Sequence, residues 1–146
     1  MSTRGLYGFI ENRDYTANYN HSDSYPSGLG VEFLTACKNG DFSGFDIVED
    51  SIDFIKDSLF CEWAYFYDRD HDIFEIWKGY QKFPDSTNPF GQETRNDYYP
   101  CKRIFRGHIS SIDANDMKDN RDLESFLTSI HRDKQINRVL NDTNSR

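Results

Sequence analysis

Two neighbouring segments, one rich in aromatic residues and one whose side chains alternate between two faces, constrain the fold of this chain most strongly. Residues 62–68 read EWAYFYD, in which four of seven residues are aromatic, and residues 73–78 read IFEIWK. Aromatic and β-branched residues favour strands, and the charged residues 69–72 between the segments favour a turn. A β-hairpin is therefore predicted. Its alternation places Ile73, Glu75 and Trp77 on one face and Phe74, Ile76 and Lys78 on the other.

Further strands and helices follow from the same kind of pattern. The predicted strands cover 6–11, 15–20, 63–68, 73–80 and 102–110. Helices are predicted near 29–38, with Ser27 as the N-cap and Asn39-Gly40 as the stop, and near 122–134, where Leu123, Phe126, Leu127 and Ile130 have helical spacing. Residues 41–57 are expected to form a second helical region with an acidic, solvated face.

This order of elements predicts the α+β class. We expect a single domain over residues 1–140, built from a mainly antiparallel sheet of about five strands with helices packed on one face. Residues 141–146 are expected to be a polar C-terminal tail.

Net charge, hydropathy and cysteine content limit which partners and which cellular compartment are expected for this protein. The net charge of −8 argues against direct nucleic-acid binding, which needs a basic face. No apolar run is long enough for a membrane span, and no secretory leader is recognisable. Cys37, Cys61 and Cys101 are isolated, as expected for reduced, buried thiols in a cytoplasmic protein. No nucleotide, metalloprotease or hydrolase motif occurs, so no cofactor is predicted.

The polar loop 19–30, YNHSDSYPSGLG, is the leading candidate for a functional site. Antiparallel pairing of the first two strands should bring the start of the chain beside this loop. We therefore expect a concave ligand-binding site, in which Asp23 aligns Arg4 or His21, made of Thr3, Arg4, Asn20, His21, Asp23, Ser24 and Tyr25. The alternative is a purely structural loop, in which Asp23 and Ser24 cap backbone amides.

Three other sets of residues carry weaker signals. Trp63, Tyr65, Tyr67, Trp77 and Tyr80, together with Arg4, Arg103 and Arg106, form either a clamp for a nucleotide-like ligand or ordinary core packing. The acidic turn 68–72 is either a hard-cation site or a charged hairpin tip, and we expect Asp70 and Asp72 to be exposed and to hold no metal. Ser2 is a candidate nucleophile if Met1 is removed.

The chain also resembles a family of small proteins from bacteria, phages and fungi. The resemblance lies in Thr3-Arg4-Gly5, in the loop 19–30 and in Glu62-Trp63-Ala64-Tyr65 with the acidic turn that follows. It implies no activity. A weaker likeness to N-terminal-nucleophile amide hydrolases lies in the returning strand and its loop, although Asn20 and Asp23 stand one residue further apart than in that family.

These observations predict a small acidic cytoplasmic binding protein. Its partner is expected to be a polar small molecule or a protein, and a phage counter-defence inhibitor would fit the size and the acidity. One alternative is an amide hydrolase of the N-terminal-nucleophile type. Another is an acidic mimic that blocks a nucleic-acid-binding protein. The sequence leaves open whether the protein is an enzyme.

Overall fold

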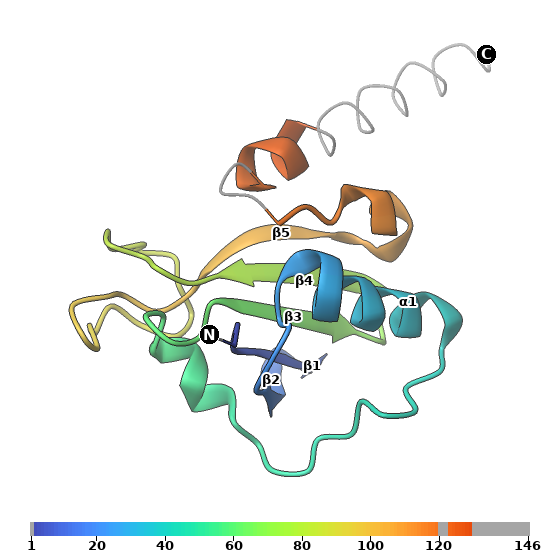
Figure 1. Ribbon diagram of the computed structural model, residues 1–146, viewed down its shortest axis with the longest axis horizontal. Helices are drawn as coiled ribbons and strands as arrows, with labels where there is room; N and C mark the ends of the chain where they lie inside the picture. Colours follow the sequence, from blue (N-terminus) through green and yellow to red (C-terminus); the bar gives the residue numbers. More distant parts are fainter. Residues whose placement is uncertain (1, 120–122, 130–146) are drawn as a thin grey trace.

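A computed structural model describes residues 2–119 and 123–129, and in it five strands form one sheet (Figure 1). The spatial order is β2-β1-β3-β4-β5, made of β1 (Gly5–Glu11), β2 (Asp14–Asn20), β3 (Trp63–Asp68), β4 (Ile73–Lys78) and β5 (Lys102–His108). All neighbouring strands are antiparallel except β1 and β3, which run parallel. The predicted α+β class and mostly antiparallel sheet are confirmed. The strands β4 and β5 end two residues earlier than predicted.

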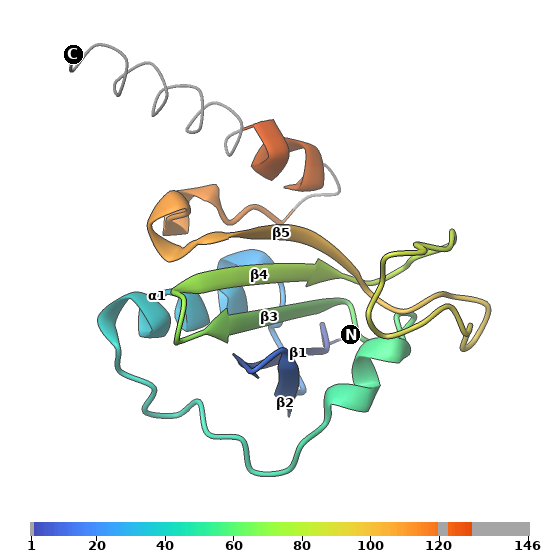
Figure 2. The same ribbon diagram turned by 180° about the vertical axis from the view of Figure 1, so that it is seen from behind.

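The helix α1 (Val31–Asn39) crosses one face of the sheet, as both views show (Figures 1 and 2). Its predicted N-cap at Ser27 is wrong, because a π-helical turn (Pro26–Gly30) precedes the helix and contains that serine. The predicted stop is confirmed. Gly40 has a φ of 67°, a left-handed conformation that favours glycine and ends α1.

Residues 41–57 are not the predicted helical region. Only Ile52–Lys56 forms a 3₁₀ helix, and residues 41–51 run irregularly around the edge of the sheet beside β2. The reason lies in what the acidic side chains bind. The Asp50 carboxylate accepts hydrogen bonds from the backbone N–H of Ala17 and of Ile52, each at 3.1 Å. Tertiary bonds to β2 thus replace a solvated helical face.

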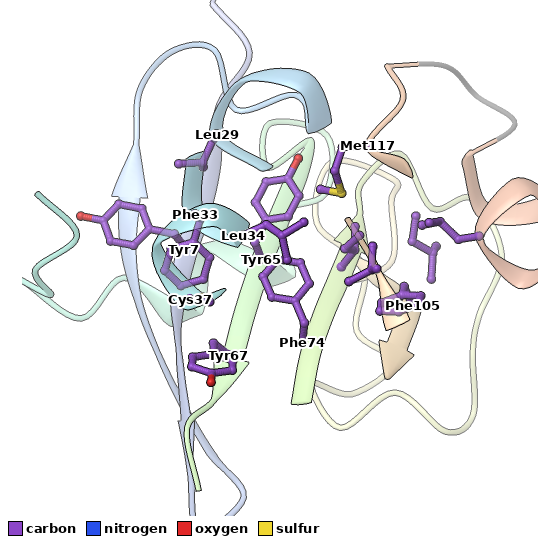
Figure 3. Close-up of a cluster of buried hydrophobic side chains, with 14 of the residues drawn as sticks. Tyr7, Leu29, Phe33, Leu34, Cys37, Tyr65, Tyr67, Phe74, Phe105 and Met117 are labelled. Carbon is purple, nitrogen blue, oxygen red and sulfur yellow. The ribbon is translucent and has the colours of Figure 1, made fainter. Parts of the chain in front are cut away.

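Two hydrophobic cores lie on the two faces of the sheet. The larger one fills the space under α1 and includes Phe33, Tyr65, Phe74 and Phe105 (Figure 3). The smaller one lies on the opposite face, around Leu6, Ala17, Ile55, Phe66 and Trp77. The predicted alternation of β4 is confirmed, because Phe74 and Ile76 belong to the first core and Trp77 to the second.

The end of the described chain packs beside β5. Short 3₁₀ helices, Ile109–Ser111 and Ala114–Asp116, follow that strand. Residues 123–129 are helical, with Leu123 and Leu127 buried, as the predicted helix over 122–134 requires. The rest of that helix and the tail 141–146 lie outside the described residues. Within the described ranges, none of the helices is both long and apolar enough to cross a membrane.

Candidate functional site

The polar loop that follows β2 is held by its own hydrogen bonds. The Asn20 amide donates to the Ser22 carbonyl at 2.6 Å and to the Ser24 Oγ at 2.8 Å. Ser24 is fully buried, its N–H donates to the Thr3 carbonyl, and its carbonyl accepts from the Tyr65 hydroxyl at 2.8 Å. Asn20 and Ser24 therefore fix the loop against the start of β1, and their side chains face the interior of the loop.

Asp23 is also engaged inside the loop. Its φ of 56° is left-handed, and its carbonyl accepts a hydrogen bond from Leu29 N–H at 2.9 Å. The negative charge of its carboxylate raises the pKa of the neighbouring Tyr25 phenol. No ion pair joins Asp23 to Arg4 or to His21 among the described residues. Asp23 was predicted to align Arg4 or His21, and among the described residues it does neither through an ion pair.

The start of the chain and the loop do form a groove, as the strand pairing predicts. The groove has a volume of about 630 Å³ and is lined by Ser2, Thr3, Arg4, His21, Leu59, Phe60, Glu62 and Tyr80. The Arg4 guanidinium lies 5.5 Å from the centre of the Phe60 ring. Burial and the Glu62 carboxylate raise the pKa of Tyr80 to about 12. Of the predicted site residues, Thr3, Arg4 and His21 line this groove, whereas Asn20, Asp23, Ser24 and Tyr25 do not.

A second site lies over β4, on the sheet face opposite α1. Glu75 projects from the middle of this strand, and its side chain is only 3% exposed. Its Oε1 accepts hydrogen bonds from the Tyr15 hydroxyl at 2.8 Å and from Trp77 Nε1 at 2.9 Å. Burial, followed by the Glu75 charge, raises the pKa of Tyr15 well above its ordinary value. Two neutral donors thus hold a buried carboxylate in place.

The other oxygen of Glu75 faces two arginines of β5. Its Oε2 lies 3.5 Å from Arg103 Nη1 and 3.6 Å from Arg106 Nε. Residues three apart on a regular strand point to opposite faces of a sheet. A β-bulge in β5 changes this: Trp77 pairs with Arg103 and Ile76 pairs with Phe105, which leaves Ile104 without an opposing residue.

The bulge sorts the side chains of β5 into two groups. Ile104 and Phe105, although adjacent, both pack into the core under α1. Arg103 and Arg106 consequently both reach Glu75 on the other face. The side chains of Arg103 and Arg106 are 43% and 54% exposed, so they extend from the buried carboxylate into solvent. The bulge therefore brings two cations together at one point above the sheet.

These arginines line a cavity of about 590 Å³. Its other lining residues are Ile10, Asn12, Arg13, Tyr15, Asp68, His71, Ile73, Glu75, Thr87 and Pro89. An arginine fork has five N–H donors, and each contact with Glu75 uses one nitrogen, so donors remain for an oxyanion in the cavity. Cavities of this size suit small organic ligands. We call this cavity, with Glu75 at its base, the arginine pocket.

Of the two interpretations of the aromatic residues, the structure favours core packing over a ligand clamp. Tyr65 and Tyr67 are buried under α1, and Trp77 is buried on the opposite face of the sheet. These rings cannot grip one ligand together, and core packing explains most of them. Two of the arginines assigned to that clamp, Arg103 and Arg106, do come together, with Trp77 5.9 Å from the Arg103 guanidinium.

The acidic turn between β3 and β4 lies at the rim of the arginine pocket. Asp68 accepts hydrogen bonds from the backbone N–H of Asp70 and of His71, and its carboxylate lies 3.0 Å from the His71 ring. Asp70 and Asp72 are exposed, as predicted. Over residues 2–119 and 123–129, no three histidine, cysteine, aspartate or glutamate side chains converge in a way that could hold a metal ion.

No protein family, curated protein or solved structure matches this chain. The interpretation of both cavities therefore depends on their geometry. The sequence contained one signal for the arginine pocket: Glu75 is a carboxylate on the same strand face as Ile73 and Trp77, where an apolar residue would be expected. The bulge that brings the arginines to Glu75 had no comparable signal.

Proposed function

We propose that this protein binds a small anionic ligand in the arginine pocket. The observation that carries the proposal is the pairing of Arg103 and Arg106 over one buried carboxylate by the bulge in β5. Moving a charged group from water into a protein interior costs several kcal/mol, and the attraction within a buried ion pair often offsets only part of that cost. Such an arrangement is better explained by a ligand that the arginines hold than by stability.

Each residue has a distinct role in this proposal. Arg103 and Arg106 donate hydrogen bonds to the ligand, because guanidinium forks match the oxygens of carboxylates and phosphates. Glu75 is a positioning residue that keeps both guanidinium groups at the base of the pocket. Tyr15 and Trp77 fix Glu75 by hydrogen bonds to the oxygen that faces away from the arginines.

Thermal unfolding in the presence of small anions tests the proposal. Phosphate, sulfate and citrate are added at constant ionic strength, so that general screening does not change. A ligand at ten times its Kd stabilises the native state by about 1.4 kcal/mol, which raises the Tm of a domain of this size by several degrees. We expect at least one of these anions to raise the Tm of the wild-type protein.

Two double variants locate the binding. Replacement of Arg103 and Arg106 by glutamine should abolish the rise in Tm. Replacement of Lys38 and Lys82 by glutamine removes the same charge from exposed positions outside the arginine pocket and should leave the rise intact. Equal responses in the two variants, or no response to any anion in the wild type, would refute the proposal.

The groove at Arg4 is a second candidate binding surface, also for a polar ligand. The observation that favours it is the stacking of Arg4 on the half-exposed Phe60, with no acidic partner for Arg4 among the described residues. Arg4→Ala should then weaken ligand binding and leave the Tm of the free protein nearly unchanged. A wild-type affinity in this variant would remove the groove from consideration.

The other functions predicted from sequence receive less support. Ser2, the candidate nucleophile, lines the groove at Arg4. The Asn20 amide, however, donates its hydrogen bonds to Ser22 and Ser24 inside the loop, so Asn20 does not contact a nucleophile at the start of the chain. Roles in phage counter-defence, in binding a protein partner, or as an acidic mimic of nucleic acid stay predictions.

A further inference from the structure

We infer that the ligand of the arginine pocket carries a phosphate monoester in its dianionic form. This inference rests on the proposed anion binding and specifies its chemistry. It is drawn from the charge of the residues that line the pocket, from the geometry of the two guanidinium groups, and from the size of the cavity.

The charges that line the pocket do not balance. Its cations are Arg13, Arg103 and Arg106, and its acids are Glu75 and Asp68. Asp68 is already occupied by two backbone N–H groups and by the His71 ring. Glu75 supplies a single negative charge to two arginines. Three cations and two acids leave the lining with a net charge of +1 in a chain whose net charge is −8, and a positive potential attracts a dianion more strongly than a monoanion.

The geometry of the donors also favours a phosphoryl group. Arg103 and Arg106 approach the same carboxylate oxygen, one through Nη1 and the other through Nε, so two separate guanidinium groups supply the donors. A carboxylate ligand presents only two oxygens, which lie in one plane. A phosphoryl group presents three terminal oxygens in different directions, which gives both arginines, and Arg13 at the rim, an acceptor.

The size of the cavity indicates that the phosphoryl group belongs to a larger molecule. A volume of about 590 Å³ is in the range of sites for small organic ligands and is far larger than one phosphate ion needs. The lining also includes the side chains of Ile10, Ile73 and Pro89. These apolar groups can cover an organic body while the arginines hold its phosphate.

Phenyl phosphate and phenyl sulfate provide a matched pair of probes. They share one ring and a tetrahedral head, but phenyl sulfate is a monoanion throughout the working range, whereas a phosphate monoester becomes a dianion above a pKa of about 6. Isothermal titration calorimetry at pH 8 should show phenyl phosphate binding about tenfold more tightly or better, which corresponds to about 1.4 kcal/mol. At pH 5 the two affinities should converge.

His71 is the one histidine among the residues that line the pocket. The titrations are therefore repeated with His71→Gln, in which the ratio of the two affinities should change with pH as in the wild type. A ratio that no longer changes with pH in this variant would assign the effect to His71 and overturn the inference.

Arginine variants link the probe to the pocket. Arg106→Lys keeps the positive charge and removes the planar guanidinium fork. It should weaken the affinity for phenyl phosphate about tenfold. The circular dichroism spectrum should stay that of the wild type. The Lys38 and Lys82 double variant should bind as the wild type does. Unchanged affinity in Arg106→Lys would overturn the inference.

The outcomes separate this inference from the proposed function. Equal affinities for phenyl phosphate and phenyl sulfate at pH 8, or tighter binding of benzoate, would overturn the phosphate assignment and leave anion binding in place. Failure of phenyl phosphate, phenyl sulfate and benzoate to bind at millimolar concentration would overturn both. Tighter binding of inorganic phosphate than of phenyl phosphate would overturn the assignment of the ligand as a phosphate monoester, whereas recognition of a phosphoryl group would still hold.

Discussion

Removal of the Tyr15 hydroxyl and the Glu75 carboxylate, singly and together, measures how firmly the base of the arginine pocket is held. Tyr15→Phe deletes a hydroxyl that donates to the carboxylate at 2.8 Å. Its ring keeps an edge-on contact with Phe66, whose centroid lies 4.9 Å away. A hydrogen bond to a charged group contributes about 1.5–3 kcal/mol, so we expect the free energy of unfolding to fall by that amount.

Glu75→Leu has a larger expected effect. It leaves the buried Trp77 Nε1–H and the Tyr15 hydroxyl without their acceptor, and each unpaired donor costs about 1–3 kcal/mol. Loss of a buried charge offsets part of this cost, which gives a net destabilisation of about 2–4 kcal/mol.

Urea denaturation of the wild type, the two single variants and the double variant completes a double-mutant cycle. We expect a coupling energy between Tyr15 and Glu75 of about 1.5–3 kcal/mol, because the double variant loses their hydrogen bond only once. Additivity within about 0.5 kcal/mol would show that the two groups do not interact, and the described base of the pocket would then be wrong.

Three further predictions concern the fold and the loop. Because the pKa of Tyr15 is raised, the native state keeps a proton that the unfolded state loses above pH 10. The free energy of unfolding should therefore fall above pH 10 by up to about 1.4 kcal/mol per pH unit. Urea denaturation at pH 9 and at pH 11 should show a smaller fall in Tyr15→Phe than in the wild type. Gly8→Ala should lower the free energy of unfolding by more than about 3 kcal/mol, because the new Cβ would clash with a backbone carbonyl of β2. Gly40→Ala lies in open space at a φ of 67° and should lower it by about 1 kcal/mol. Equal losses of stability in thermal unfolding would contradict this prediction. Asn20→Ala should lower the free energy of unfolding by about 1–3 kcal/mol and the exposed His21→Ala by less than about 0.5 kcal/mol, and the reverse order would show that the loop is held differently.

The strands were predictable because their signal is local. In β3 and β4, aromatic content and alternation identify the strands, and the turn between them sets the register of the hairpin. The parallel pairing of β1 with β3 was not predictable in the same way. It depends on where α1 and residues 41–51 carry the chain, and no pattern within β1 or β3 encodes that path.

One wrong prediction and one feature that the sequence did not predict have a common physical cause. Residues 41–57 have an acidic and apolar spacing that suits a helix, but Asp50 binds the backbone of β2 instead. Arg103 and Arg106 are three apart in sequence and would lie on opposite faces of a regular strand, but the bulge at Ile104 places them on one face. In both cases contacts with distant residues override the local pattern. The groove at Arg4 was predictable in part because strand pairing alone brings Thr3 and His21 together.

The most direct test of the arginine pocket is a crystal structure of the protein soaked in selenate. Selenate is a tetrahedral dianion, and its selenium gives an anomalous signal that locates it independently of any assumed site. We predict an anomalous peak between the guanidinium groups of Arg103 and Arg106, on the side away from Glu75, with N–O distances of about 2.7–2.9 Å. A peak only at Arg4 or at other surface cations, with the arginine pocket empty, would contradict the proposed function.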